Sequence, residues 1–166
     1  MIIYLFNVNI CILWGSKGGK KMDLIFKEVT KENWEECIEL KVSKDQEEFV
    51  APNSYSLLEA NFGEGLYPLS IYDGETMVGF LMYEKDEEDN TMGMCRLMID
   101  NKHQKKGYGR ASVLKLLDLI REKYGNIEFF TSFEPENIVA DKLYESVGFK
   151  KTGEIMWEEL VAKIDL

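Results

Sequence analysis

The sequence predicts a single α/β domain built on a mixed, mainly antiparallel central sheet flanked by helices. The first observation is a hairpin signal, because Asp73-Gly74 separates two runs rich in β-branched and aromatic residues. The second is an amphipathic pattern over residues 108–124, which predicts a helix that crosses over between two strands. The third is size, since 166 residues with 45% hydrophobic content suffice for one well-packed core and are few for two.

The expected elements before the hairpin are one strand and two short helices. Residues 24–29 predict the strand, and Thr30 is expected to cap a helix over residues 34–41, where apolar side chains recur at helical spacing. An irregular, charged connection over residues 42–52 then leads to a second helix over residues 55–62, which is closed by glycines.

The remaining elements are strands and two longer helices. We expect strands at 69–72, 77–83 and 91–99, a helix at 108–124, a strand at 127–133, a helix at 137–147, and strands at 149–153 and 157–164. An acidic turn over residues 84–90 separates the hairpin from the strand that follows it. The periodicity of the first long helix predicts that it buries Ala111, Leu114, Leu117 and Ile120.

Residues 1–21 are expected to be a leader outside the domain, which occupies residues 22–166. The apolar stretch over residues 1–14 is too short to span a bilayer, and it lacks the basic start and the cleavage site of a signal peptide. Lys17-Gly18-Gly19 can be encoded by a purine run that contains a bacterial ribosome-binding sequence, so we predict that Met22 is the physiological start. The alternatives are an extra β-strand or a hydrophobic segment that binds a partner.

The charge and the cysteines limit the class of protein. The net charge of −10 argues against nucleic acid and membrane surfaces as partners and suits a small, cationic substrate. Cys11, Cys37 and Cys95 are widely separated and odd in number, which predicts reduced thiols in a cytoplasmic protein. Because His103 is the only histidine, we expect no metal site.

The most informative stretch is a strand, a basic turn and a helix over residues 97–123. Gly107 and Gly109 have no Cβ atom, so a ligand can approach the backbone closely there. The turn and the start of the helix also carry three basic side chains, Lys105, Lys106 and Arg110. Because such a turn directs several N–H groups to one point at the positive end of a helix, it predicts a phosphate site.

Two common phosphate-binding loops do not fit this stretch. A nucleoside triphosphatase loop ends in Gly-Lys-Ser/Thr, whereas this chain has Gly109-Arg110-Ala111. A dinucleotide loop has a third glycine where this chain has Ser112. The spacing Gln104-x-x-Gly107-x-Gly109 instead resembles the pyrophosphate loop of the GCN5-related N-acetyltransferase (GNAT) superfamily, which binds acetyl-coenzyme A (acetyl-CoA).

A second motif of the same superfamily follows at the expected place. Residues 137–149 match the pattern N-x-x-A-x-x-L-Y-x-x-x-G-F, in which Asn137 and Tyr144 fall on neighbouring faces of a helix. Two independent motifs in the right order are more specific than either alone. The resemblance covers residues 24–164 and implies an acetyltransferase that uses acetyl-CoA.

The resemblance also implies roles for individual residues. Leu97, Met98 and Ile99 would pair with the pantetheine arm through their backbone, and an amide near Met98 would polarise the thioester carbonyl. Asn137 would bind the pantetheine region, and Tyr144 would be the general acid that protonates the leaving thiolate. The residues implied to hold the pyrophosphate are Gln104, Lys105, Lys106, Gly107, Tyr108, Gly109 and Arg110.

The general base stays unassigned at this point. An alkylammonium group has a pKa of about 10, so it must lose a proton before it can attack a thioester. Many superfamily members carry Glu or Asp on the strand just before the pantetheine-pairing residues, but this chain has Cys95-Arg96 there. Asp100, Glu134 and a chain of water molecules are the alternatives.

Within the superfamily, the chain looks most like bacterial spermine/spermidine acetyltransferases. This closer resemblance rests on three stretches, Val42–Gln46, Tyr72–Tyr83 and Arg96–Asp100. A flexible polycation suits an acidic cleft. The acidic residues that are candidates to line such a cleft are Asp45, Glu47, Glu48 and those of the turn over residues 84–89.

Three other functions are kept as alternatives. They are acetylation of a different small amine such as an antibiotic, acetylation of a protein N-terminus, and acyl-CoA binding without catalysis. The absence of a strand carboxylate favours the inactive module, whereas the presence of Tyr144 argues against it. Strand edges near the C-terminus are compatible with a homodimer.

Overall fold

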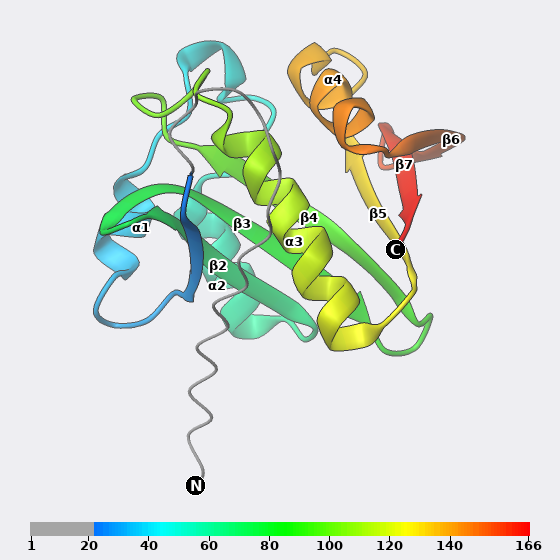
Figure 1. Cartoon of the computed structure of the whole chain (residues 1–166), viewed down its shortest axis with the longest axis horizontal. Coiled ribbons are helices and arrows are strands. Elements are labelled where there is room, and N and C mark those ends of the chain that lie inside the picture. Colours follow the sequence, from blue (N-terminus) through cyan, green and yellow to red (C-terminus); the bar gives the residue numbers. More distant parts are fainter. Residues whose placement is uncertain (1–21) are drawn as a thin grey trace, which may run out of the picture.

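The computed structural model describes residues 22–166, which form one seven-stranded sheet with helices on both faces (Figure 1). The elements are β1 (Leu24–Glu28), α1 (Trp34–Glu39), the 3-10 helix η1 (Lys44–Gln46), α2 (Asn53–Phe62), β2 (Leu66–Asp73), β3 (Thr76–Asp86), β4 (Thr91–Ile99), α3 (Tyr108–Tyr124), β5 (Glu128–Phe133), α4 (Ile138–Val147), β6 (Lys150–Met156) and β7 (Glu159–Asp165). The leader expected over residues 1–21 lies outside the described residues.

The strand order is β1-β2-β3-β4-β5-β7-β6, and β4 with β5 is the parallel pair. The other neighbouring strands pair in the antiparallel sense. The predicted α/β fold with a mixed, mainly antiparallel sheet is therefore confirmed. Figure 1 shows α3 lying across the sheet, with α4, β6 and β7 grouped around β5.

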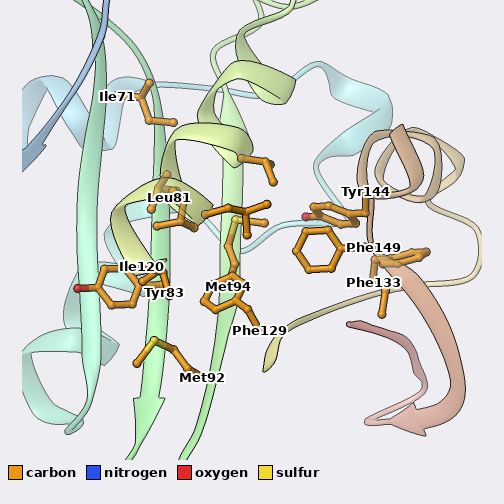
Figure 2. Close-up of a cluster of buried hydrophobic side chains, with 14 of the residues drawn as sticks. Ile71, Leu81, Tyr83, Met92, Met94, Ile120, Phe129, Phe133, Tyr144 and Phe149 are labelled. Atoms are coloured by element: carbon orange, nitrogen blue, oxygen red, sulfur yellow. The ribbon is translucent and has the colours of Figure 1, made fainter. Parts of the chain in front are cut away.

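The sheet separates two hydrophobic clusters. Successive residues of β3 alternate between them, because Leu81 belongs to the cluster beneath α3 and α4, whereas Phe80 and Met82 belong to the cluster beneath α1 and α2. Figure 2 shows the larger cluster, in which side chains of β2 to β5 meet those of α3 and α4. The domain therefore has two layers of helices over one sheet.

The long helix α3 buries a different set of residues from the one predicted. Val113, Leu116, Leu117 and Ile120 are buried, at positions i, i+3, i+4 and i+7. Ala111 and Leu114 are only half-buried and pack at the margin of the helix face, so the prediction was wrong for them. Leu117 and Ile120 are buried as predicted.

The first helix also differs from the prediction. Asn33, not Thr30, occupies the cap position of α1, and the Asn33 side-chain oxygen accepts a hydrogen bond of 2.7 Å from the Thr30 backbone N–H. The helix ends at Glu39, because Lys41 turns away to exchange hydrogen bonds with the turn after β4. Long-range contacts therefore replace the last turn that local periodicity predicts.

The predicted hairpin of β2 and β3 is confirmed, but β3 is longer than expected. Gly74 lies in its turn with φ +62°. At the open end, a Cβ on Gly65 would lie 2.2 Å from the Lys85 carbonyl oxygen, so glycine allows the close approach of the two chains. As a result, Glu84 to Asp86 belong to β3 and not to the acidic turn that was predicted to include them.

Candidate active site

The candidate site lies where β4 and β5 separate. The two strands pair only at Gly93 with Phe130 and at Met94 with Thr131, and a bulge at Cys95 interrupts the pairing of β4 with β3 at the same level. Beyond this point β4 continues to Ile99 without pairing to β5. The result is a gap between two strands that is bordered on one side by the backbone of β4.

The backbone groups that border the gap belong to alternate residues of β4. The Asp100 N–H donates to the Val78 carbonyl on β3, at 2.9 Å. Because backbone groups alternate between the two edges of a strand, those of Met98 also point toward β3, and those of Leu97 and Ile99 point toward the gap. A backbone amide near Met98 that points into the gap is therefore that of Leu97 or Ile99, and not that of Met98 itself. The Met98 side chain is buried beneath α1 and α2.

Asp100 organises the turn that follows β4. Its carboxylate is buried and accepts hydrogen bonds of 3.1 Å from the backbone N–H groups of Lys41 and Lys102. The His103 N–H donates to the Asp100 carbonyl oxygen, at 2.7 Å. A carboxylate engaged on both oxygens is a structural group, which argues against Asp100 as the general base.

The Gln104 side chain stabilises the same turn through hydrogen bonds within the chain. Its amide donates to the carbonyl oxygen of Ile99 at 3.0 Å and to the side-chain oxygen of Gln46 at 2.7 Å. The first bond closes the turn onto the end of β4, and the second ties it to η1. Gln46 therefore borders the candidate site; the sequence singles out its stretch, Val42–Gln46, but not this contact.

The turn ends in a backbone conformation suited to an anion. Lys105 has φ +60° and Gly107 has φ +89°, and Gly107 is the N-cap residue of the 17-residue helix α3. No side chain caps this end, and the first turn carries no acidic residue. The N–H groups of Tyr108, Gly109 and Arg110 therefore remain at the positive end of the helix, where they fit a phosphate group.

Three of the predicted pyrophosphate ligands use their side chains in hydrogen bonds within the chain. The Tyr108 hydroxyl donates to the Asp73 carboxylate at 2.6 Å, and this bond raises the pKa of Tyr108. Arg110 donates to the Ser146 carbonyl oxygen on α4 at 3.4 Å, and Lys106 donates to the Lys102 carbonyl oxygen at 2.7 Å. The groups left to bind an anion at this turn are thus mainly backbone N–H groups, as at other helix N-termini.

Asn137 begins the second motif and caps α4. Its side-chain oxygen accepts a hydrogen bond of 3.0 Å from the Ala140 N–H, and Gly148 ends the helix with φ +107°. The predicted bounds of this helix are therefore confirmed. The side-chain nitrogen of Asn137 makes no hydrogen bond within residues 22–166 and is the part of the residue available to a ligand.

Tyr144 lies on α4 and is buried between the rings of Phe133 and Phe149, at centroid distances of 5.5 and 5.6 Å. In Figure 2 its hydroxyl points away from these rings toward β4. Burial raises the pKa of Tyr144 to about 12, and the Thr131 hydroxyl acts in the opposite direction. Thr131 also donates to the Met94 carbonyl oxygen at 3.0 Å, so the phenol stands near the point where β4 and β5 separate.

Of the acidic residues expected to line a cleft, Asp45, Glu47 and Glu48 lie beside the turn after β4, whereas those over residues 84–89 lie at the opposite end of β4. Asp45 belongs to η1, and Glu47 and Glu48 follow it, with all three exposed. The pKa of Asp45 is lowered mainly by the Ser43 hydroxyl, with a smaller contribution from the Lys105 charge. This segment and the turn are therefore neighbours, although nearly sixty residues separate them in the sequence.

The described part of the chain gives no sign of a metal centre, because no group of three or more His, Cys, Asp or Glu side chains in residues 22–166 could hold an ion. Over the same residues, none of the helices combines the length and the apolar character needed to cross a membrane.

Comparison with protein families identifies the chain. A model of the acetyltransferase (GNAT) family matches residues 26–149. The chain therefore belongs to the GNAT family and is an acetyl-CoA-dependent N-acetyltransferase. The predicted superfamily, enzyme class and cosubstrate are confirmed.

The relatives include polyamine acetyltransferases. The chain is 28% identical over 140 residues to spermine/spermidine N(1)-acetyltransferase of Bacillus subtilis (strain 168), covering 81% of this chain and 92% of that protein. It is 31% identical over 86 residues to N-acetylaspartate synthetase of Homo sapiens, covering 51% of this chain and 28% of that protein.

Solved structures share the fold. Spermidine N-acetyltransferase from Vibrio cholerae in complex with CoA and spermine has a TM-score of 0.69 at 15% identity, covering 88% of this chain and 96% of that chain. A paia N-acetyltransferase from Thermoplasma acidophilum in complex with coenzyme A has a TM-score of 0.66 at 14% identity, covering 87% and 100% of the two chains.

Proposed function

We propose that this enzyme transfers the acetyl group of acetyl-CoA to a primary amine of a polyamine such as spermidine or spermine, with Tyr144 as the general acid. The observation that carries the proposal is a buried phenol, with a pKa raised to about 12, whose hydroxyl lies near the start of the gap between β4 and β5. A phenol that stays protonated at neutral pH is able to donate a proton to a leaving thiolate.

The binding roles follow from the donors that the chain presents. The backbone N–H groups at the start of α3 hold the pyrophosphate, with Lys105 adding positive charge. The gap-facing backbone groups of Leu97 and the N–H of Ile99 hold the pantetheine arm, and the Asn137 side-chain nitrogen supports it from α4. Acetyl-CoA supplies the activated acetyl group.

The chain's own residues then assist the transfer. A backbone amide at the gap edge of β4 stabilises the negative charge that develops on the thioester oxygen when the amine attacks. Tyr144 protonates the sulfur as the carbon–sulfur bond breaks. A phenol in an apolar pocket suits this step, because it is held between two rings and is screened from water.

The polyamine is favoured by charge and by the relatives. The chain carries a net charge of −10, and the exposed carboxylates Asp45, Glu47 and Glu48 lie beside the anion site. The relative that aligns over most of both chains is named a spermine/spermidine acetyltransferase. An extended polycation would place one amine at the thioester and its other charges against these carboxylates.

Thiol release from acetyl-CoA by the full chain tests the proposal, with spermidine, spermine, a monoamine, aspartate and a short peptide supplied in parallel. We expect turnover with both polyamines and at least tenfold lower kcat/KM for the other acceptors. Preference for the monoamine, aspartate or the peptide would overturn the assigned substrate. Tight coenzyme A binding without turnover on any amine would indicate a binding module.

A further inference from the structure

The structure offers a carboxylate beside the gap that the sequence motifs do not reveal. Glu84 lies on β3 directly opposite Gly93 of β4. Gly93 and Met94 are the two residues at which β4 still pairs with β5 before the strands separate. Because neighbouring strands lie about 4.8 Å apart, Glu84 stands one strand away from the start of the gap.

β4 itself is unable to supply a carboxylate at this level. A Cβ on Gly93 would lie 2.6 Å from Cε1 of the Phe130 ring, so no side chain fits there. Cys95 and Arg96 occupy the next positions of β4. A carboxylate near the start of the gap on this face must therefore come from a neighbouring element.

Glu84 faces the side of the sheet that carries α1 and α2, because Met82, two residues earlier, is buried in the cluster on that side. Cys95 lies close to Glu84, since the pKa of the Cys95 thiol is raised to about 12 by burial and then by the Glu84 charge. Tyr144 belongs to the cluster on the opposite face. The carboxylate and the phenol thus approach the gap from opposite faces of the sheet.

The Glu84 carboxylate is available to a ligand. Within residues 22–166 it makes no hydrogen bond and no ion pair, although it is half-buried. Arg96, the cation on this face, donates one nitrogen to Glu59 at 3.0 Å and another to the Cys95 carbonyl oxygen at 2.8 Å. Both terminal nitrogens of the arginine are therefore engaged elsewhere, whereas its buried Nε has no hydrogen-bond partner within residues 22–166.

The surrounding charges make this carboxylate a better proton acceptor than an exposed one. Burial raises the pKa of Glu84, the charge of Arg96 opposes this, and the charges of Glu59 and Asp86 raise it further. Together with the half-buried Cys95 thiol, these are the charged and titratable groups that face it. A bound ammonium group would supply the positive partner that the carboxylate lacks.

We propose that Glu84 is the general base that takes a proton from the attacking ammonium group, directly or through one water molecule. This inference rests on the proposed function. An N–H bond of the ammonium breaks, and its proton passes to the Glu84 carboxylate, which later releases it to water. The nitrogen lone pair forms the bond to the acetyl carbon as the carbon–sulfur bond breaks. The thiolate takes the Tyr144 proton, and the second proton lost by the nitrogen restores the phenol.

The pH dependence of Glu84→Gln tests this role. With the carboxylate, kcat/KM depends on ionised Glu84 and on the protonated amine, so it is nearly flat across neutral pH. Without it, only amine that is already deprotonated reacts, so kcat/KM rises about tenfold per pH unit. We expect a loss of about 100-fold at pH 7 that shrinks for an acceptor amine of pKa near 7.

Glu122→Gln, an exposed substitution on α3 far from the gap, is the matched control and is expected to keep the wild-type profile. Thermal unfolding and coenzyme A binding are measured on both variants to exclude a folding defect. Equal pH profiles in Glu84→Gln and wild type would overturn this proposal alone. No turnover by the wild type on any amine would overturn the proposed function and this proposal with it.

Discussion

Two sets of residues near the gap, one expected to hold the cosubstrate and one expected to bind the acceptor amine, are built in opposite ways. In the turn after β4, the side chains of Asp100, Gln104 and Tyr108 are all engaged in hydrogen bonds within the chain, and they fix the backbone. In the second set, Glu47 is exposed beside this turn, and the Glu84 carboxylate on β3 has no partner within residues 22–166. We therefore expect recognition of the cosubstrate to depend on backbone geometry and recognition of the acceptor amine to depend on charge.

The largest effect is expected at Tyr144, which belongs to neither set. Tyr144→Phe keeps the ring and its packing but removes the proton donor, so we expect kcat to fall about 100-fold with coenzyme A affinity unchanged. Thiol release and isothermal titration calorimetry measure the two quantities. An unchanged kcat would show that the thiolate leaves without help from Tyr144.

In the set expected to hold the cosubstrate, backbone geometry is tested at Gly107. An alanine there must adopt φ +89°, which costs about 1–2 kcal/mol and shifts the N–H groups at the start of α3. We therefore expect about tenfold weaker coenzyme A binding. Gly125→Ala is the matched control, because Gly125 ends the same helix with φ +81° and has an open environment. It should lose at least as much stability, because ψ of −158° places Gly125 in a region that is essentially restricted to glycine, but it should keep coenzyme A affinity. Equal loss of coenzyme A affinity in both variants would contradict the assignment of the pyrophosphate to the N–H groups at the start of α3.

In the set expected to bind the acceptor amine, charge is tested by the combined substitution Asp45→Asn, Glu47→Gln and Glu48→Gln. Removal of three exposed carboxylates should raise KM for spermidine about fivefold at low salt and leave KM for acetyl-CoA unchanged. The difference from wild type should shrink at high salt, because exposed charges are screened. An effect that is independent of salt would argue against an electrostatic role.

The smallest effect is expected at Asn137, where one side chain has a structural and a binding task. Asn137→Asp keeps the oxygen that caps α4 but removes the amide nitrogen, so stability should hold while KM for acetyl-CoA rises about threefold. Asn137→Ala should lose the cap as well, at a cost of about 1 kcal/mol in unfolding free energy. If the two variants bind acetyl-CoA like wild type, Asn137 is a capping residue alone.

Much of the fold could be predicted because its signals are local. Asp73-Gly74 marks the hairpin, and Asn137 and Gly148 bound α4 where the sequence places them. The first helix and the buried face of α3 were partly wrong, since tertiary contacts decide them. Lys41 leaves the helix to bond with Asp100, 59 residues away, and no local pattern reports such a partner.

The same distinction applies to the site. The turn after β4 is visible in the sequence because its glycines and basic residues form one contiguous motif. The positions of Gln46 and Glu84 at the site are not visible, although the sequence singles out residues 42–46 and 84–89, because these residues reach the site from elements that become neighbours only in the folded sheet. Glu84 was further obscured by the prediction of a turn where β3 continues to Asp86.

The most direct test of the central claim is the identification of the product. The full chain is incubated with acetyl-CoA and an equimolar mixture of spermidine, a monoamine and a short peptide, and the products are analysed by mass spectrometry. We predict monoacetylated spermidine as the main product, formed only in the presence of both enzyme and acetyl-CoA and nearly absent with Tyr144→Phe. Main acetylation of the monoamine or the peptide would contradict recognition of the acceptor by its distributed charge.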